Sequence, residues 1–282
     1  MKKLVLIGNP VGHSMSPIMH NAALKHLGLD KNFNYSKRDV KDKDLSSFVD
    51  ELRNERVYGA NVTIPHKVNV MKYVDGLTKE AYLIGAVNTI FLEEDKVIGH
   101  NTDGIGCLEA LNEKCVKVKN KNILILGAGG AAKALAITFG INNAKSVSIL
   151  NRTVKKAKKL STDVKEKTDA DSDFSGLSNL NDFIQKSDIL INSTPVGMKG
   201  EFENKTIAKK GFLRKNLVVM DIVYNPIKTR LIKDAEDVGC KVVEGLGMLL
   251  YQGAEGFEIW TKRKAPVKVM KRALKEELKA VK

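Results

Sequence analysis

The feature that most constrains the fold of this 282-residue chain is an apolar run followed at once by a glycine-rich turn and a helical pattern. Residues 122–126 are NILIL, residues 127–132 are GAGGAA, and residues 133–140 are KALAITFG. A strand, a G-x-G-x-x-A turn and a helix in this order form the context of a dinucleotide-binding loop. The first glycine permits the tight turn, the second lets the backbone approach a pyrophosphate, and the final alanine keeps the helix close to the strand. A glycine-rich turn with a purely structural role is the alternative.

The residues around this turn predict a doubly wound α/β domain. Apolar runs at residues 146–150, 189–192 and 217–223 alternate with helical patterns, as expected of parallel strands that are buried on both faces. An earlier strand-like run, KKLVLIG at residues 2–8, begins a separate α/β stretch, and the charged segment 113–121 separates the two. We therefore expect two domains, an α/β substrate-binding domain and a Rossmann-type doubly wound domain with a cleft between them. The tail also has a helical pattern, with apolar residues at Ala273, Leu274, Leu278 and Val281.

The end of the second apolar run indicates which dinucleotide is bound. An NAD-binding domain carries an Asp or Glu at this point for the ribose hydroxyls, whereas this chain has Asn151, Arg152 and Thr153. A guanidinium can hold a 2′-phosphate with two hydrogen bonds, and a carboxylate would repel that phosphate. The sequence therefore favours NADP, with Lys155 and Lys156 as further support. A solvated surface role for Arg152 is the alternative.

Composition excludes several classes of protein. The three cysteines have neither zinc-site nor disulfide spacing, and the apolar run at the N-terminus is too short for a signal peptide, so we expect no metal and a cytoplasmic location. No stretch approaches the length that crosses a bilayer. The net charge of +14 raises nucleic-acid binding as an alternative. However, the basic residues are mainly lysines spread along helix-like stretches, so we expect a solvated surface and no nucleic-acid partner.

Short polar clusters mark the first domain, and no one of them is diagnostic alone. Ser14 and Ser16 precede a helix that begins with Pro17, so they can cap it or offer hydroxyls to a carboxylate. Together with the glycine turn, these clusters belong to nine ordered blocks: GHSMSPIMHNAA, GANVTIPHK, IGAVNTI, GHNTDGIG, GAGGAAKA, NRT, NSTPVGM, DIVYNP and GLGMLLYQG. In order and spacing, these blocks resemble the shikimate dehydrogenase family.

The resemblance implies reversible NADPH-dependent reduction of 3-dehydroshikimate to shikimate, in the pathway to chorismate and the aromatic amino acids. It assigns catalysis to Lys67 and Asp103, a pair suited to supplying a proton to a developing alkoxide. It implies that the substrate is bound by Ser14, Ser16, Thr63, Lys67, Asn88, Asp103, Tyr224 and Gln252. It implies that NADP is bound by Gly127, Ala128, Gly129, Gly130, Ala131, Asn151, Arg152, Thr153, Val154, Lys155, Lys156, Ile222 and Gly245.

The same resemblance assigns residues 1–102 and 246–282 to the substrate domain and 103–245 to the NADP domain. Two histidines depart from the common pattern, His66 and His100, and we expect both to be neighbours of the site and not participants. The partner is the small-molecule substrate, and we expect a homodimer or a monomer. Two rival hypotheses remain, a broader quinate/shikimate dehydrogenase and a non-catalytic NADP-binding regulator.

Overall fold

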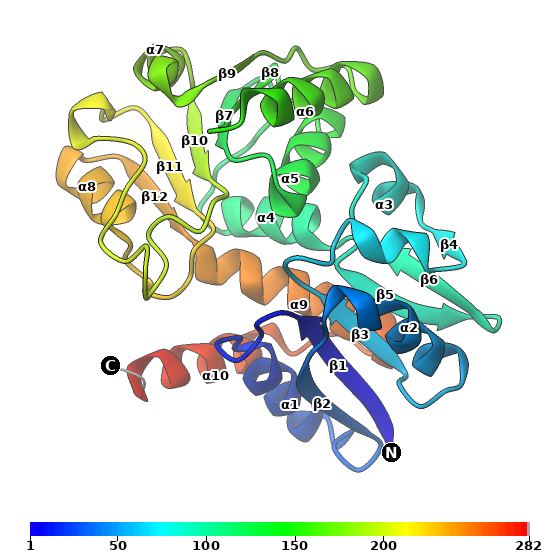
Figure 1. Cartoon of the computed structure of the whole chain (residues 1–282). Coiled ribbons are helices and arrows are strands. Elements are labelled where there is room, and N and C mark those ends of the chain that lie inside the picture. The colour runs from blue at the N-terminus through cyan, green and yellow to red at the C-terminus, as the bar shows by residue number, and fades with distance from the viewer. Residues whose placement is uncertain (281–282) are drawn as a thin grey trace. The chain divides into compact units, whose positions relative to one another are not determined.

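A computed structural model describes residues 1–280, so the predicted helical position Val281 lies outside the described residues. The chain divides into two compact units, Met1–Asp103 with Leu250–Lys282, and Gly104–Leu249. Each unit has its own sheet (Figure 1), and the expected α/β fold with a doubly wound second domain is confirmed. Asp103 groups with the first unit, and its side chain bonds to Lys67 there. Residues 246–249 group with the second, where Gly247 packs closely against Ala110.

The first unit contains a mixed sheet with the strand order β2-β1-β3-β5-β6-β4. Its strands are β1 (Lys2–Gly8), β2 (Phe33–Asp39), β3 (Gly59–Val62), β4 (Gly76–Leu77), β5 (Thr89–Glu93) and β6 (Lys96–His100). β1 pairs in parallel with β2 and β3, whereas β5 runs antiparallel to both β3 and β6. The carboxyl end of β3 therefore lies beside the amino end of β5, which brings two of the predicted polar clusters to one edge.

Helices cover this sheet through apolar faces with helical spacing. They are α1 (Ser16–His26), α2 (Leu45–Arg53), α3 (Lys79–Ile84), α9 (Gly245–Thr261) and α10 (Val267–Ala280). α10 packs against α1 and buries Met270, Leu274 and Leu278, which are spaced by four residues and so share one face. The predicted helical pattern of the tail is therefore confirmed up to Ala280. α9 begins in the second unit and continues into the first.

The second unit contains a fully parallel sheet with the strand order β12-β11-β10-β7-β8-β9. Its strands are β7 (Asn122–Leu126), β8 (Ser146–Leu150), β9 (Phe174–Ser175), β10 (Ile189–Asn192), β11 (Val218–Asp221) and β12 (Lys241–Glu244). The chain proceeds outward from β7 in one direction and then from β10 in the other. The strand order therefore reverses between these two strands, which is where doubly wound folds bind dinucleotides.

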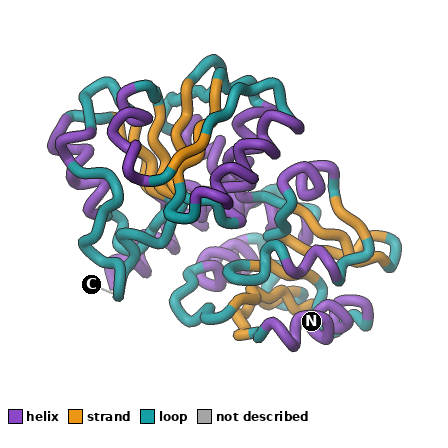
Figure 2. The backbone as a smooth tube through the Cα atoms, turned by 45° about the horizontal axis from the view of Figure 1, so that its top comes forward, coloured by secondary structure: helices purple, strands orange, loops and turns teal. Residues whose placement is uncertain are grey.

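Helices flank the strands of the second unit on both sides (Figure 2). They are α4 (Asp103–Glu113), α5 (Gly130–Ile141), α6 (Val154–Lys167), α7 (Leu180–Gln185) and α8 (Arg230–Val238). Because both faces of the sheet are covered, the central strands need no polar face, and residues 123–126 of β7 are buried. This burial explains why the strand appears in the sequence as a continuous apolar run.

The first unit also buries a histidine side chain whose ring nitrogens make no hydrogen bonds within the described residues. His20 on α1 is fully buried, and neither ring nitrogen has a hydrogen-bond partner within residues 1–280. Its ring stacks on Tyr35 with centroids 4.1 Å apart and an interplanar angle of 7°, and it lies 5.7 Å from the Trp260 ring. Because burial penalises the charged form, the pKa of His20 falls to about 3.

This burial predicts a loss of stability in acid. Since the pKa of His20 is 6.5 ordinarily and about 3 in the folded chain, the unfolded state binds more protons between these values. The free energy of unfolding should therefore fall as pH falls through that window, by up to about 5 kcal/mol. His20→Phe keeps an aromatic ring and should flatten this dependence in urea unfolding at a series of pH values. The control His26→Gln, an exposed residue of the same helix, should follow the wild type, and equal slopes for His20→Phe and wild type would contradict the account.

Candidate active site and cofactor-binding loops

An ion pair between Lys67 and Asp103 is the centre of the candidate active site. Lys67 lies on the turn that follows β3, and Asp103 is the first residue of α4. The ammonium of Lys67 donates to Oδ2 of Asp103, and the two side chains are 14% and 5% exposed. The pair is therefore largely withdrawn from water, where a charge interacts more strongly with its neighbours than it does at the surface.

Asn88 completes the hydrogen bonding of this pair. Its Nδ2 donates to Oδ1 of Asp103 at 2.8 Å, so both carboxylate oxygens have a donor. Nδ2 also lies 3.4 Å from Oε1 of Gln252 on α9, and Oδ1 of Asn88 accepts from the backbone N of Thr102 at 2.8 Å. Four of the predicted substrate residues, Lys67, Asn88, Asp103 and Gln252, therefore form one connected network.

The predicted serine pair lies at the start of α1. The Ser14 hydroxyl donates to the Ser16 hydroxyl at 3.2 Å, and Ser16 is buried. The N-cap residue of α1 is Met15, which makes no side-chain capping bond, so neither serine occupies the N-cap position. Thr63 lies just after β3, where its backbone N donates to the Ile7 carbonyl at 2.8 Å. Tyr224 belongs to the second unit, on the segment that follows β11.

The two histidines near this network bond to other groups. Nε2 of buried His66 lies 2.6 Å from the Val40 carbonyl oxygen, and Nδ1 lies 3.0 Å from Oδ1 of Asp42. Nδ1 of His100 lies 2.8 Å from the Thr78 hydroxyl, and burial lowers the pKa of His100 against a smaller opposing effect of Glu80. These contacts favour supporting roles for both rings.

The predicted cofactor residues follow four parallel strands of the second unit, all at carboxyl ends. The glycine turn follows β7, residues 151–156 follow β8, Ile222 follows β11, and Gly245 follows β12. The chain thus gathers these loops at one edge of the sheet, the edge at which open α/β sheets bind their ligands.

Two glycines of the turn have different local constraints. Gly127 has a φ of 114°, and a Cβ there would lie 2.6 Å from Oγ of Ser193, so the fold itself requires glycine. Gly129 is exposed and has ordinary φ, and a Cβ there would meet nothing within 4 Å. The chain alone does not require glycine at this position, whereas a pyrophosphate approaching the backbone at the start of α5 would.

The loop after β8 is basic and exposed. Asn151 Nδ2 donates to the Thr153 carbonyl at 3.0 Å, which shapes the turn before α6. Arg152, Lys155 and Lys156 are exposed, and within residues 1–280 Arg152 makes no ion pair. With no carboxylate among residues 151–156, this loop fits a ligand that carries a 2′-phosphate.

A buried carboxylate that sequence analysis missed ties two loops of the second unit together. Asp221, at the end of β11, accepts from Nδ2 of Asn192 at 3.0 Å, from the Thr229 hydroxyl at 2.7 Å and from the backbone N of Val223 at 3.0 Å. Burial raises the pKa of Asp221 to about 6, and these hydrogen bonds oppose the rise. Its only sequence signal is an acidic residue at the end of an apolar run.

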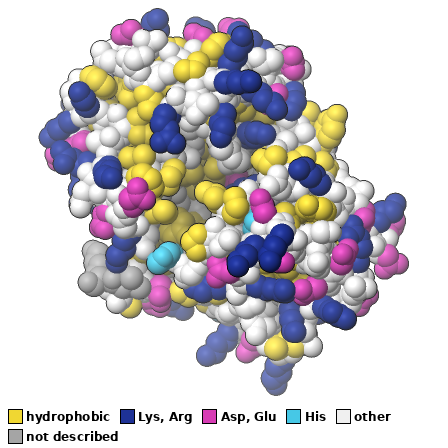
Figure 3. Space-filling model, in the orientation of Figure 1, with side chains coloured by type: hydrophobic (Ala, Val, Ile, Leu, Met, Phe, Trp, Pro, Cys, Tyr) yellow, Lys and Arg dark blue, Asp and Glu magenta, His cyan; other side chains and the backbone are white. Residues whose placement is uncertain are grey.

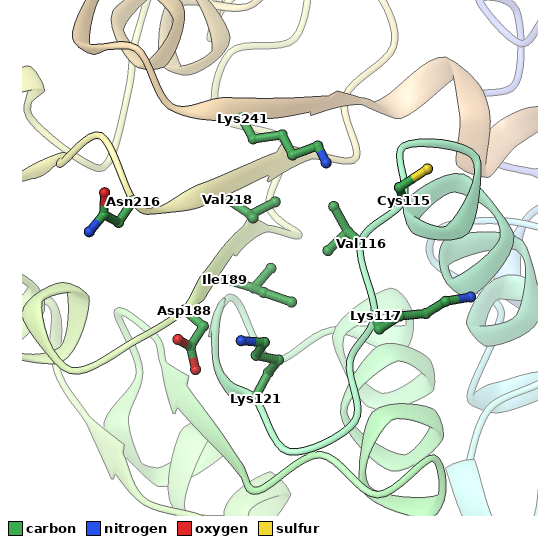
Figure 4. Close-up of a pocket in the computed structure, with 9 residues that line it drawn as sticks. All are labelled: Cys115, Val116, Lys117, Lys121, Asp188, Ile189, Asn216, Val218 and Lys241. Carbon is green, nitrogen blue, oxygen red and sulfur yellow. The ribbon is translucent and has the colours of Figure 1, made fainter.

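A cavity of about 190 Å³ lies at the opposite end of the same sheet (Figure 4). Its lining includes residues at or just before the amino ends of strands, such as Lys121, Asp188 and Lys241. Figure 4 shows the Lys117 amine pointing away from the other lining residues. The cavity is therefore separate from the glycine turn, and it is not the dinucleotide site.

Basic side chains are dispersed on the face seen in Figure 3, with acidic side chains among them. None of the described helices has both the length and the apolar character needed to cross a membrane.

The glycine turn gives a direct test of cofactor binding. Gly129→Ala should leave thermal stability unchanged, because a Cβ has open space there. It should weaken NADPH binding by roughly tenfold or more, because the Cβ occupies the space that the pyrophosphate needs. Fluorescence titration with NADPH measures this effect, and Gly211→Ala, where a Cβ also meets nothing within 4 Å, is the matched control. Unchanged affinity in Gly129→Ala would show that no pyrophosphate approaches this backbone.

Comparison with known protein families covers most of the chain. Residues 6–90 match the shikimate dehydrogenase substrate binding domain. Residues 109–238 match the shikimate / quinate 5-dehydrogenase model, and residues 245–275 match the shikimate 5′-dehydrogenase C-terminal domain.

Individual relatives agree with these matches. Shikimate dehydrogenase (NADP⁺) of Methanocaldococcus jannaschii is 47% identical over 281 residues, covering 98% of this chain and 97% of the relative. A crystal structure of shikimate dehydrogenase in complex with NADP⁺ is similar with a TM-score of 0.92 and 47% identity, covering 99% of this chain and 96% of that one. The Listeria monocytogenes enzyme in complex with shikimate and NAD has a TM-score of 0.90 and 40% identity, covering 97% and 96%.

Proposed function

The chain belongs to the shikimate dehydrogenase family, and we propose that it catalyses the reversible NADPH-dependent reduction of 3-dehydroshikimate to shikimate. This reaction is a step in the synthesis of chorismate and the aromatic amino acids. The observation that carries the proposal is the network of Lys67, Asp103 and Asn88, because it holds the Lys67 side-chain nitrogen beside the Asp103 carboxyl group in a largely buried position.

The chemistry that we assign to this network is proton transfer. Reduction of a ketone adds a hydride to carbon and a proton to oxygen, and the bound NADPH supplies the hydride. The Lys67–Asp103 pair supplies the proton to the developing alkoxide, and the ammonium stabilises the negative charge on that oxygen before the transfer is complete. In the reverse direction the same pair accepts the proton from the hydroxyl.

We assign binding of the substrate carboxylate to Ser14 and Ser16. Their hydroxyls are adjacent, and neither occupies the N-cap position of α1. For the ring hydroxyls and the carbonyl we propose Thr63, Lys67, Asn88, Asp103, Tyr224 and Gln252. A site with so many fixed polar groups discriminates against analogues that lack a hydroxyl, because its own groups would then be left without partners.

We assign NADP to the loops at the carboxyl edge of the parallel sheet. The open space beside Gly129 fits a pyrophosphate, and exposed Arg152 fits the 2′-phosphate with Lys155 and Lys156. Ile222, which follows β11, and Gly245, which follows β12, complete the proposed set, and a Cβ on Gly245 would collide with the Ile222 carbonyl. The close approach of these two backbones holds the two loops together.

We further propose that the enzyme acts in the cytoplasm as a homodimer or a monomer and uses no nucleic-acid partner. The Lys67–Asp103 pair disfavours a non-catalytic regulator, because a cofactor sensor has no need of a proton donor.

The absorbance of reduced nicotinamide tests the proposed function, with shikimate and quinate each assayed against NADP and NAD. We expect turnover largely confined to shikimate with NADP. Comparable turnover with quinate or NAD would assign the chain to the broader quinate/shikimate class. Tight NADP binding without turnover would support the regulator.

Arg152→Ala tests the 2′-phosphate assignment. The substitution should raise the KM for NADP by roughly tenfold to a hundredfold, since a charge-assisted hydrogen bond contributes about 1.5–3 kcal/mol. The KM for NAD should change little, because NAD lacks that phosphate. Lys165→Ala, an exposed lysine in the last turn of α6, is the control and should affect neither cofactor. An equal loss with both cofactors would remove Arg152 from phosphate recognition.

A further inference from the structure

Tyr35 on β2 is held from several directions in the first unit. Its side chain is 1% exposed, and its ring stacks on His20. Its backbone N donates to Oδ1 of Asn21 at 3.0 Å, and its carbonyl accepts from Nδ2 of the same residue at 2.8 Å. Both the backbone and the ring of Tyr35 are therefore fixed to α1, which leaves its hydroxyl little freedom to move.

The hydroxyl of Tyr35 contacts a buried residue beside the proposed active site. It donates to Oδ1 of Asn61 at 2.7 Å. Burial raises the pKa of Tyr35, and Ser16 has a smaller opposing effect. The phenol is therefore a neutral donor at neutral pH, and it donates to Asn61.

Asn61 links the Tyr35 hydroxyl to Asn88 through hydrogen bonds. Because Oδ1 of Asn61 accepts from Tyr35, its Nδ2 faces the Asn88 carbonyl at 3.1 Å and the Thr89 hydroxyl at 3.2 Å. The Thr89 hydroxyl in turn donates to Oδ1 of Asn88 at 2.9 Å. With Oδ1 of Asn88 occupied by donors, its Nδ2 is directed at Asp103. The side chains of these five residues are all buried, so bulk water cannot replace a hydrogen-bond partner that is lost.

We propose that Tyr35 is a positioning residue, which acts through Asn61 to orient Asn88 and thereby the Asp103–Lys67 pair. This inference rests on the proposed function for its kinetic consequence, but its geometric consequence is independent of that function. Without the phenolic hydroxyl, Oδ1 of Asn61 loses its donor in a buried site, and the amide can turn so that its oxygen opposes the Asn88 carbonyl. Asn88 then loses the arrangement that directs Nδ2 at Asp103.

Tyr35→Phe removes only the hydroxyl and keeps the ring that stacks on His20. We expect kcat for shikimate oxidation to fall by about tenfold to a hundredfold, as for displacement of a catalytic group by a remote change. Each kcat is calculated from the concentration of NADPH-binding sites, so a smaller fraction of folded protein does not lower the value. NADPH affinity should be unchanged, because Tyr35 is not one of the proposed cofactor residues. Tyr58→Phe, a half-buried tyrosine that packs on Phe33, is the matched control and should keep wild-type kcat.

A double variant and a crystal structure separate positioning from general damage. If Tyr35 acts through Asn61, then Tyr35→Phe combined with Asn61→Ala should be no slower than Asn61→Ala alone. If the rate losses of the two single variants multiply in the double variant, Tyr35 does not act through Asn61. In a crystal structure of Tyr35→Phe, the Asn88 amide should have moved beyond hydrogen-bonding distance of Asp103. An unchanged Asn88–Asp103 contact would overturn the inference whether or not shikimate is the substrate, whereas absent wild-type turnover would count only against the proposed function.

Discussion

The ion pair between Lys67 and Asp103 is the interaction on which the rest of the proposed site depends. Removing two charges from water costs free energy. A protein tolerates such buried charges when each is paired and hydrogen-bonded. Asn88 meets that need by donating to the second carboxylate oxygen, and Gln252 and the backbone of Thr102 complete the surroundings of Asn88. The first unit can therefore present a proton donor and a charge-stabilising group in one fixed arrangement, as ketone reduction requires.

The second unit meets a different requirement with a different part of its fold. A parallel sheet brings the carboxyl ends of its strands to one edge, and the loops there can bind a long anionic ligand. The glycine turn provides a close backbone approach, the loop after β8 provides positive charge, and buried Asp221 ties the loops after β10 and β11 together. In the proposed function, the first unit carries the residues assigned to proton transfer, and the second unit carries the residues assigned to the cofactor.

The sequence predicted those features whose signal is local. The turn at Gly127 follows an apolar run directly, whereas Lys67 and Asp103 were assigned only through the resemblance to a family, and their roles stay a prediction. The hydrogen-bond partners were not predictable, because Tyr35 and Asn61 are 26 residues apart and Asn88 and Gln252 are 164 apart. Only the pairing of strands brings such residues together, and only side-chain orientation decides which atom donates. For the same reason, the sequence could not predict that His20 on α1 is buried without hydrogen-bond partners among the described residues.

The central claim is that Lys67 and Asp103 act as one unit, and a double-mutant cycle on kcat/KM for shikimate tests it most directly. Lys67→Met and Asp103→Asn should each lower kcat/KM by roughly two to four orders of magnitude. The double variant should be no worse than the poorer single variant, because removing either member already disables the pair. NADPH titration of each variant should give the wild-type affinity. Losses that multiply in the double variant would contradict the account, since the two side chains would then contribute independently.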